Sequence, residues 1–331
     1  MLALRLSLAL ESGDLELPET GRIAVVAPPV EADLSALPKD RVTVVSGFYP
    51  AHHGFETRGY EAKVTPEGPY ALSILCLPRA KAEARAALAE IVPLTEGPVV
   101  IDGQKTDGVE SVLKELRKLG EVGAVTVKAH GKLFTYRGDM PADWAAKPGA
   151  VPRPGGGVFQ TAPGVFSADG VDPGSAALAT ALPRDLKGRV IDLGAGWGVL
   201  SDAVLQSPKV THLDLVEANH AALQAAQANI SDPRAAFHWA DALVFQTEPA
   251  DHVVCNPPFH TGRSAEPALG QAFIKAAARL LRPKGRLWLV ANRHLPYERV
   301  LDEWFRDVNI LTVTDGFKVT MAQNPRIPRK G

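Results

Sequence analysis

Four residues, Asn256-Pro257-Pro258-Phe259, join a side-chain amide to two prolines and an aromatic ring directly after the apolar run Val253-Val254-Cys255. The Asn256 amide oxygen and the Pro257 carbonyl offer two acceptors, which suits an amino group with two N–H hydrogens. Holding both hydrogens would aim the nitrogen lone pair before reaction. The prolines stiffen the loop, and Phe259 offers a face on which a planar base can stack. These four residues predict methyl transfer to an amino nitrogen, although a rigid turn is the alternative interpretation of the motif alone.

A second motif, Asp192-Leu193-Gly194-Ala195-Gly196-Trp197-Gly198, also follows an apolar run. Glycine lets the backbone approach a ligand closely, and ligands bind at the carboxyl ends of parallel strands. Glu217 lies 21 residues past Gly196, where an acid can accept from ribose hydroxyls. Asp241 ends the third predicted strand and can accept from an adenine amino group. The pattern predicts a nucleotide cofactor; NAD fits the first three strand ends, and Asn256 at the fourth favours S-adenosylmethionine.

These residues need an α/β framework to bring them together, and the pattern of apolar runs predicts one in each half. In the second half we expect strands at 189–193, 212–217, 236–239, 252–256, 285–291 and 309–314, and helices at 175–181, 198–206, 219–229, 267–281 and 297–304. In the first half we expect strands at 22–27, 41–45, 72–77 and 99–102, helices at 81–91 and 108–119, and a hairpin at 123–136. Strands separated by helices predict a parallel, doubly wound sheet with right-handed crossovers.

The Pro- and Gly-rich segment 147–157 predicts a linker without helix or strand, which divides the chain into domains 1–147 and 148–331. The first strand of the first domain runs into Ala27-Pro28-Pro29, with no glycine turn. We therefore expect no cofactor site in that domain.

Composition limits the class of protein. Hydrophobic residues make up 46% of the 331 residues, enough for one or two cores, and the net charge of −1 gives no global attraction to nucleic acid. Two cysteines, the lack of a signal peptide and the lack of a membrane-length apolar run predict a cytoplasmic protein without membrane association. His52-His53 has no accompanying cluster, so we expect no metal site. Five cations form a candidate basic patch, or are ordinary charges near a helix end: Arg279, Arg282, Lys284, Arg286 and Arg293.

With these motifs in hand, the second half resembles class I S-adenosylmethionine-dependent methyltransferases, and specifically the bacterial 16S ribosomal RNA guanine-N2 methyltransferase family. The resemblance is strong from Pro163 onward, through the segment 163–175 and Asn256-Pro257-Pro258-Phe259-His260-Thr261-Gly262. It implies two tandem Rossmann-like methyltransferase domains, a degenerate N-terminal one and a C-terminal one with a seven-stranded doubly wound sheet. It also implies that Phe166 and Ser167 line the cofactor or base pocket.

The expected activity is methylation of guanine N2 in ribosomal RNA, most simply of the small subunit, by a protein that acts as a monomer. The candidate catalytic residues are Asn256, Pro257, Pro258 and Phe259. The candidate cofactor-binding residues are Phe166, Asp192, Gly194, Ala195, Gly196, Glu217, Ala218, Asp241, Ala242 and Asn256. The alternatives are methylation of adenine N6, of a 23S ribosomal RNA guanine or of a release-factor glutamine, an NAD-dependent enzyme, and a non-catalytic RNA-binding protein.

Overall fold

The computed structural model describes residues 1–258 and 267–326. Contacts between residues divide the chain into two compact units, Met1–Pro148 and Gly149–Gly331. In the described part of the chain, no helix has the length and apolar character needed to cross a membrane.

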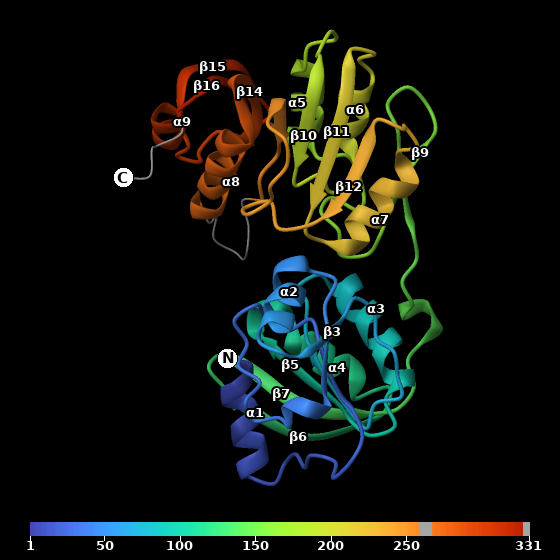
Figure 1. Ribbon diagram of the computed structural model, residues 1–331. Coiled ribbons are helices and arrows are strands. Elements are labelled where there is room, and N and C mark those ends of the chain that lie inside the picture. The colour runs from blue at the N-terminus through green and yellow to red at the C-terminus, as the bar shows by residue number, and fades with distance from the viewer. Residues whose placement is uncertain (259–266, 327–331) are drawn as a thin grey trace. The chain divides into compact units, whose positions relative to one another are not determined.

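The first unit is built on a seven-stranded sheet with the order β3-β2-β1-β4-β5-β7-β6 (Figure 1). Its strands are β1 (Ile23–Val26), β2 (Val42–Val45), β3 (Glu61–Lys63), β4 (Leu72–Cys76), β5 (Val99–Gln104), β6 (Glu121–Lys128) and β7 (Gly131–Arg137). Its helices are α1 (Leu2–Glu11), α2 (Tyr49–Thr57), α3 (Lys81–Ile91) and α4 (Val109–Leu116), with 3-10 turns at Lys39–Arg41, Val92–Leu94, Lys105–Asp107 and Ala142–Trp144. Strands β1 to β5 pair in parallel, and β7 is antiparallel to both β5 and β6.

The second unit repeats this plan, because its sheet has the order β12-β11-β10-β13-β14-β16-β15. The strands are β10 (Gly188–Leu193), β11 (Val210–Glu217), β12 (Ala235–Trp239), β13 (Ala250–Cys255), β14 (Leu281–Asn292), β15 (Phe305–Thr314) and β16 (Phe317–Pro325). The helices are α5 (Pro173–Ala181), α6 (Val199–Leu205), α7 (His220–Asn229), α8 (Pro267–Leu280) and α9 (Glu298–Trp304). The outer strand β15 pairs with β16 in an antiparallel ladder whose register shifts between Ile310 and Thr312.

Helices cover both faces of the second sheet, because each central strand sends buried side chains to both sides. Leu178 of α5, Val204 of α6 and Ala226 of α7 belong to one apolar cluster with Val190 and Leu213 of the sheet. Helices α8 and α9 bury their apolar stripes in a second cluster on the other face. The four strands β10 to β13 run parallel, so their carboxyl ends meet at one edge of this sheet.

The structure corrects the interpretation of segment 147–157 as a linker without regular structure. Strand β8 (Gly149–Pro152) begins within it and pairs with β9 (Val158–Thr161) in a two-stranded hairpin. Three glycines, Gly155, Gly156 and Gly157, all have positive φ and form the turn. The glycines that argued against a strand are therefore the residues that reverse the chain between two strands.

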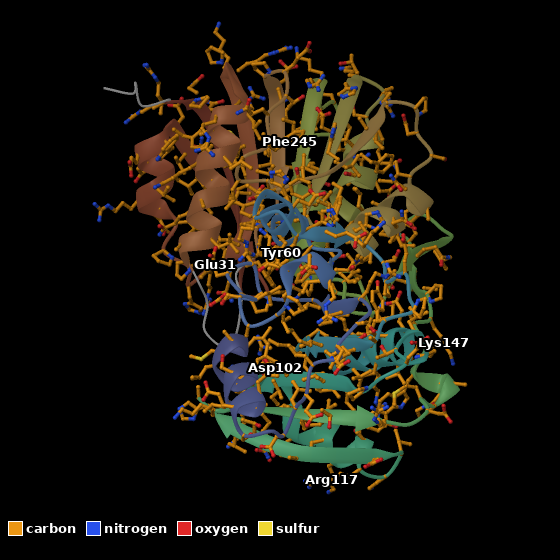
Figure 2. All side chains as sticks on the ribbon, turned by 60° about the horizontal axis from the view of Figure 1, so that its bottom comes forward. Glu31, Tyr60, Asp102, Arg117, Lys147 and Phe245 are labelled. Atoms are coloured by element: carbon orange, nitrogen blue, oxygen red, sulfur yellow. The ribbon has the colours of Figure 1, made fainter. Side chains whose placement is uncertain are left out.

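Sequence reasoning missed three elements of the first unit, α1, α2 and β3. Helix α1 carries the fully buried Arg5, whose guanidinium pairs with Asp102 of β5 at 2.6 and 2.8 Å (Figure 2 labels Asp102). His52 and His53, at which the sequence predicts no metal site, lie in α2. A buried arginine in an apolar helix is tolerated only with such a partner, which the sequence places 97 residues away.

The turn that follows the first strand differs between the two units. In the second unit the Gly194 N–H donates to Val216 O at 2.9 Å, and Gly194 has φ +81°. In the first unit the Ala27 N–H donates to Val45 O at 2.8 Å, and Ala27 also has a positive φ, +51°. The first unit therefore keeps the left-handed start of the turn, which is strained for alanine, and continues with two prolines.

Candidate active site

The glycine turn after β10 leaves space above its backbone. Gly194, Gly196 and Gly198 all have positive φ, which a residue with a side chain rarely adopts. A Cβ on Gly196 would meet no atom of the described residues within 4 Å, so within this part of the chain the turn is open on that side. The N–H groups of Gly194 and Ala195 both donate to Val216 O, which ties the turn to the neighbouring strand β11. The arrangement can admit a ligand against the main chain.

Glu217 at the end of β11 holds this turn in place. Its Oε2 accepts from the Gly196 N–H at 2.8 Å, and its Oε1 accepts from the Asn219 N–H at 2.7 Å. Burial raises the pKa of Glu217, and these backbone donors act in the opposite direction. Each carboxylate oxygen accepts more than one hydrogen bond, so both remain able to accept from vicinal hydroxyls. Glu217 thus has a structural role that the sequence did not reveal.

Asp192 lies below the turn and is completely buried. Its Oδ2 accepts from the Ser201 hydroxyl at 2.7 Å, whereas its Oδ1 is buried without a partner among the described residues. Burial, together with repulsion from Glu217, raises the pKa of Asp192 to about 7, although the hydrogen bonds from Ser201 act in the opposite direction. A buried carboxylate oxygen without a donor is costly, and a cationic or N–H group of a ligand would satisfy it.

Asn256 follows β13, and its side-chain amide is fixed in one orientation. Its Nδ2 donates to Asp172 Oδ2 at 3.0 Å and to Ser175 Oγ at 2.8 Å, which uses both amide hydrogens. Its Oδ1 is buried and has no partner within the described part of the chain. Since an amide whose N–H groups are both engaged cannot turn without losing them, the acceptor Oδ1 is held free for another donor.

Asp172 and Ser175 belong to the start of helix α5. Asp172 is the N-cap, and its Oδ2 also accepts from the Ser175 N–H at 2.8 Å, as is usual for an aspartate in this position. Proline follows it at the first helical position, which fits the helix start. Both residues lie in segment 163–175, and no role was predicted for them from the sequence. The cap signal was available, but their contact with Asn256, more than 80 residues away, was not.

A small pocket brings several of these residues together. Phe166, with 58% of its surface exposed, lies at this pocket, and its carbonyl accepts from the Trp197 indole N–H at 2.8 Å. Ser167 has a left-handed φ of +55°. The residues that line the pocket are Phe166, Ser167, Asp172, Ser175, Gly194, Ala195, Trp197, Val199, Leu200 and Asn256.

The remaining candidates either are not among the residues that line this pocket or lie outside the described residues. Asp241 Oδ1 accepts from the Leu243 N–H at 2.8 Å, Ala242 is buried, and the Ala218 carbonyl accepts from the Trp239 indole at 2.9 Å. Pro257 is buried and Pro258 is exposed. Phe259 lies outside the described residues, so its predicted stacking role stays a prediction. Residues 1–258 and 267–326 contain no group of three or more His, Cys, Asp or Glu placed to hold a metal ion.

Comparison with known proteins places this geometry in a family. The model of the methyltransferase small domain matches residues 156–321, half of the chain. The chain is 34% identical to ribosomal RNA small subunit methyltransferase C of Escherichia coli over 262 residues, 77% of this chain and 76% of the relative. Its identity to the Salmonella arizonae protein of the same name is 32% over 264 residues, 76% of this chain and 75% of the relative. The structure of the T. thermophilus 16S rRNA N2 G1207 methyltransferase in complex with AdoMet and guanosine is similar, with a TM-score of 0.78 and 26% identity over 94% of this chain and 90% of that one.

Proposed function

We propose that this chain, which belongs to the family of the ribosomal RNA small subunit methyltransferases C, transfers a methyl group from S-adenosylmethionine to N2 of a guanine in small-subunit ribosomal RNA. The observation that carries the proposal is the buried Oδ1 of Asn256, which is oriented by two donated hydrogen bonds and has no partner among the described residues. An exocyclic amino group is the donor that this acceptor suits.

The residues around the glycine turn fit S-adenosylmethionine. The space over Gly196 admits the cofactor against the backbone, and the free Oδ1 of Asp192 suits its cationic part. Glu217 suits the ribose hydroxyls, and Asp241 suits the adenine amino group. Phe166, Gly194, Ala195, Ala218, Ala242 and Asn256 complete the proposed cofactor contacts. Bound there, S-adenosylmethionine supplies a methyl group activated by its sulfonium.

The protein's own contribution is to position the target nitrogen. The lone pair of an exocyclic amino nitrogen is delocalised into the base, so the nitrogen is a poor nucleophile. When Asn256 Oδ1 and the Pro257 carbonyl each accept one of its hydrogens, the nitrogen is held with its lone pair toward the methyl group. Pro258 limits the motion of this loop, and Phe259 is proposed to stack on the base. A base in folded RNA must also leave its stack to reach this position.

The test is methyl transfer from labelled S-adenosylmethionine to 16S and 23S ribosomal RNA, adenine-containing RNA and a release factor, with mapping of modified nucleotides. We expect label on guanine N2 of 16S RNA, at the position that corresponds to the target G1207 named for the T. thermophilus relative. Label only on the release factor, on adenine or on 23S RNA would refute the substrate. Asn256→Ala is the matched control, because it removes the proposed acceptor and leaves all the other proposed cofactor residues in place.

We also propose that the first unit binds no cofactor, because Pro28 and Pro29 stand where the second unit has its glycine turn. One molecule of S-adenosylmethionine per chain in a calorimetric titration is the expected result, and two would refute it. We propose further that the protein acts as a monomer in the cytoplasm, where bacterial ribosomal RNA is found. Light scattering at working concentration tests the monomer.

A further inference from the structure

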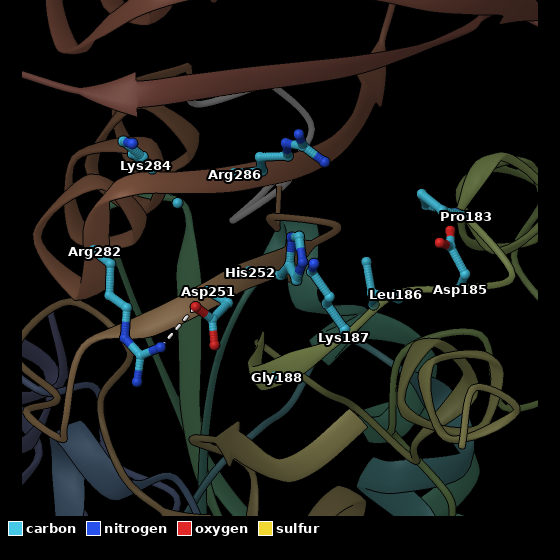
Figure 3. A pocket seen from close by; sticks show the side chains of 11 residues that line it. Pro183, Asp185, Leu186, Lys187, Gly188, Asp251, His252, Arg282, Lys284 and Arg286 are labelled. Carbon is cyan, nitrogen blue, oxygen red and sulfur yellow. Dashed lines mark hydrogen bonds and ion pairs between the residues drawn. The ribbon is translucent and has the colours of Figure 1, made fainter. Parts of the chain in front are cut away.

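A separate cavity of about 570 Å³ lies at the amino ends of the central strands of the second sheet, where β10 begins at Gly188 and β13 at Ala250 (Figure 3). The candidate active site lies at the carboxyl ends of the same strands. The cavity residues of β13, Asp251 and His252, precede Asn256 by five and four residues, which is about 13 to 17 Å at 3.3 Å per residue. The lining residues are Pro183, Asp185, Leu186, Lys187, Gly188, Asp251, His252, Arg282, Lys284, Gly285 and Arg286. None of them is among the candidate catalytic or cofactor residues.

Cations outnumber carboxylates around this cavity. Four cationic side chains line it, Lys187, Arg282, Lys284 and Arg286, and all four are exposed. Asp251 is already satisfied, because its Oδ1 accepts from Arg282 at 2.7 Å and its Oδ2 from the Arg189 N–H at 2.9 Å.

The second carboxylate, Asp185, lies 3.7 Å from Lys209, which is outside the cavity. Among the described residues, Lys187, Lys284 and Arg286 have no carboxylate within ion-pair distance; the Arg286 Nε–H donates to Gln323 Oε1 at 3.3 Å. In a chain with a net charge of −1, this is a local concentration of positive charge.

His252 adds a neutral donor to the cavity wall. The Trp288 indole N–H, which can only donate, points to His252 Nδ1 at 3.3 Å, so Nδ1 is the accepting nitrogen. Burial, followed by repulsion from Arg286, lowers the pKa of His252 to about 4, and the ring is neutral at neutral pH. The remaining proton is therefore on Nε2. Figure 3 shows this ring between the side chains of Lys187 and Arg286.

We propose that this cavity binds a backbone phosphate of the RNA substrate, held by Lys187, His252 and Arg286 at the sheet edge opposite the methylated base. The ligand class follows from the donors: an ammonium, a guanidinium and an imidazole N–H suit a phosphate anion. That the phosphate belongs to RNA rests on the proposed function, which supplies a polyanion large enough to contact both edges. Of the five cations in the candidate basic patch, only Arg282, Lys284 and Arg286 line the cavity.

The test compares Lys187→Gln/Arg286→Gln with Arg299→Gln/Arg306→Gln, a control that removes two exposed arginines elsewhere on the same unit. RNA dissociation constants are measured between about 0.05 and 0.2 M salt, the range over which phosphate contacts dominate affinity. Loss of one phosphate contact reduces the steepness of log K against log salt by about 0.7 to 0.9. With equal affinity at 1 M salt, this corresponds to an affinity about five- to eightfold weaker at 0.1 M. The control pair is expected to keep the wild-type slope.

Three results would overturn the inference. The first is an equal slope for wild type and the Lys187/Arg286 pair. The second is an equal loss in the control pair. The third is binding of inorganic phosphate to the wild-type protein, detected by shifts of the His252 resonances, when the Lys187/Arg286 pair leaves the RNA salt slope unchanged. The cavity would then bind free phosphate and not RNA. Lys187→Arg/Arg286→Lys keeps both charges and is expected to keep the slope, which guards against a folding defect.

The rate of methyl transfer at saturating RNA separates this inference from the proposed function. In the Lys187/Arg286 pair we expect that rate within twofold of wild type, with a raised KM for RNA, because the cavity is remote from Asn256. If the wild-type protein methylates no ribosomal RNA, the proposed function fails. If methylation is intact and the salt slope is unchanged, only the phosphate site fails.

Discussion

The orientation of Asn256 by Asp172 and Ser175 leads to the sharpest prediction. Asp172 Oδ2 accepts from both the Asn256 amide and the Ser175 N–H. Asp172→Ala therefore removes an acceptor for the Asn256 amide together with the cap of α5. A hydrogen bond to a charged group contributes about 1.5–3 kcal/mol, which corresponds to a loss of about 10- to 150-fold in the rate of methyl transfer if the bond acts through positioning. The lost cap costs about 0.5–2 kcal/mol of stability.

Two further substitutions separate positioning from capping. Ser175→Ala removes the other acceptor, a 2.8 Å bond from Asn256, and leaves the Ser175 N–H capped. A neutral hydrogen bond contributes about 0.5–1.5 kcal/mol, so we expect a two- to tenfold loss of rate with little change in unfolding. Asp172→Asn can place its amide oxygen where Oδ2 now accepts both bonds, and it is expected to retain most of the rate that Asp172→Ala loses.

The assay is single-turnover methyl transfer at saturating RNA and cofactor, because product release can limit kcat. Calorimetric binding of S-adenosylmethionine and the KM for RNA are measured beside it and are expected to change less than threefold. The positioning role is wrong if Asp172→Ala transfers methyl groups within twofold of wild type. It is also wrong if Asp172→Asn loses as much rate as Asp172→Ala at equal stability.

Three other outcomes follow from the described residues. Asn256→Ala is expected to bind S-adenosylmethionine normally and to lose about 10²–10³-fold in rate, as for removal of one preorganised polar contact; activity within a few-fold of wild type contradicts its role. The pKa of Asp192 is raised to about 7, so the native cofactor-free protein keeps a proton that the unfolded chain releases near pH 4. Its contribution to the free energy of unfolding therefore falls as pH rises from about 4 to about 7, and denaturant unfolding of Asp192→Asn at pH 5 and 8 is expected to lack this fall. Ala27→Gly relieves a left-handed alanine and is expected to stabilise the first unit by about 1 kcal/mol in thermal unfolding, whereas a loss of stability argues that Ala27 is not strained.

The α/β architecture, the methyltransferase family and the cofactor class were predicted from the sequence and are confirmed. The reason is physical: strands buried on both faces are continuous apolar runs, and the turns at their carboxyl ends carry glycine and acidic residues. Strand β16 was missed although Asp315-Gly316, both with positive φ, is a recognised hairpin turn signal. Helix α2 was missed because Gly54 weakens its helical pattern, and packing of Phe55 into the core stabilises the helix nevertheless. Pro50 lies in its first turn, where proline is tolerated.

The positions of candidate site residues could be predicted where they follow a strand, as for Gly194, Glu217 and Asn256, and their roles stay predictions. It was not predictable where the role depends on contacts between distant segments. The Asn256 contacts with Asp172 and Ser175, and the Asp192 oxygen that has no partner among the described residues, arise only when α5, α6 and β13 are packed together. Assignments that rest on Phe259 stay predictions.

The register shift in β15 has a consequence for how the protein behaves in crowded solution. Strand β15 is the outer strand of its sheet, and its exposed side chains include Ile310, Leu311 and Val313. A long apolar edge of this kind is a template on which the sheet of another molecule can continue. Ile310 pairs with Thr320 and Thr312 with Val319, so Leu311 is an extra residue that interrupts the regular row of hydrogen-bonding groups. The bulge thus hinders pairing of β15 with a strand of another molecule, and so limits aggregation through the outer strand of this sheet.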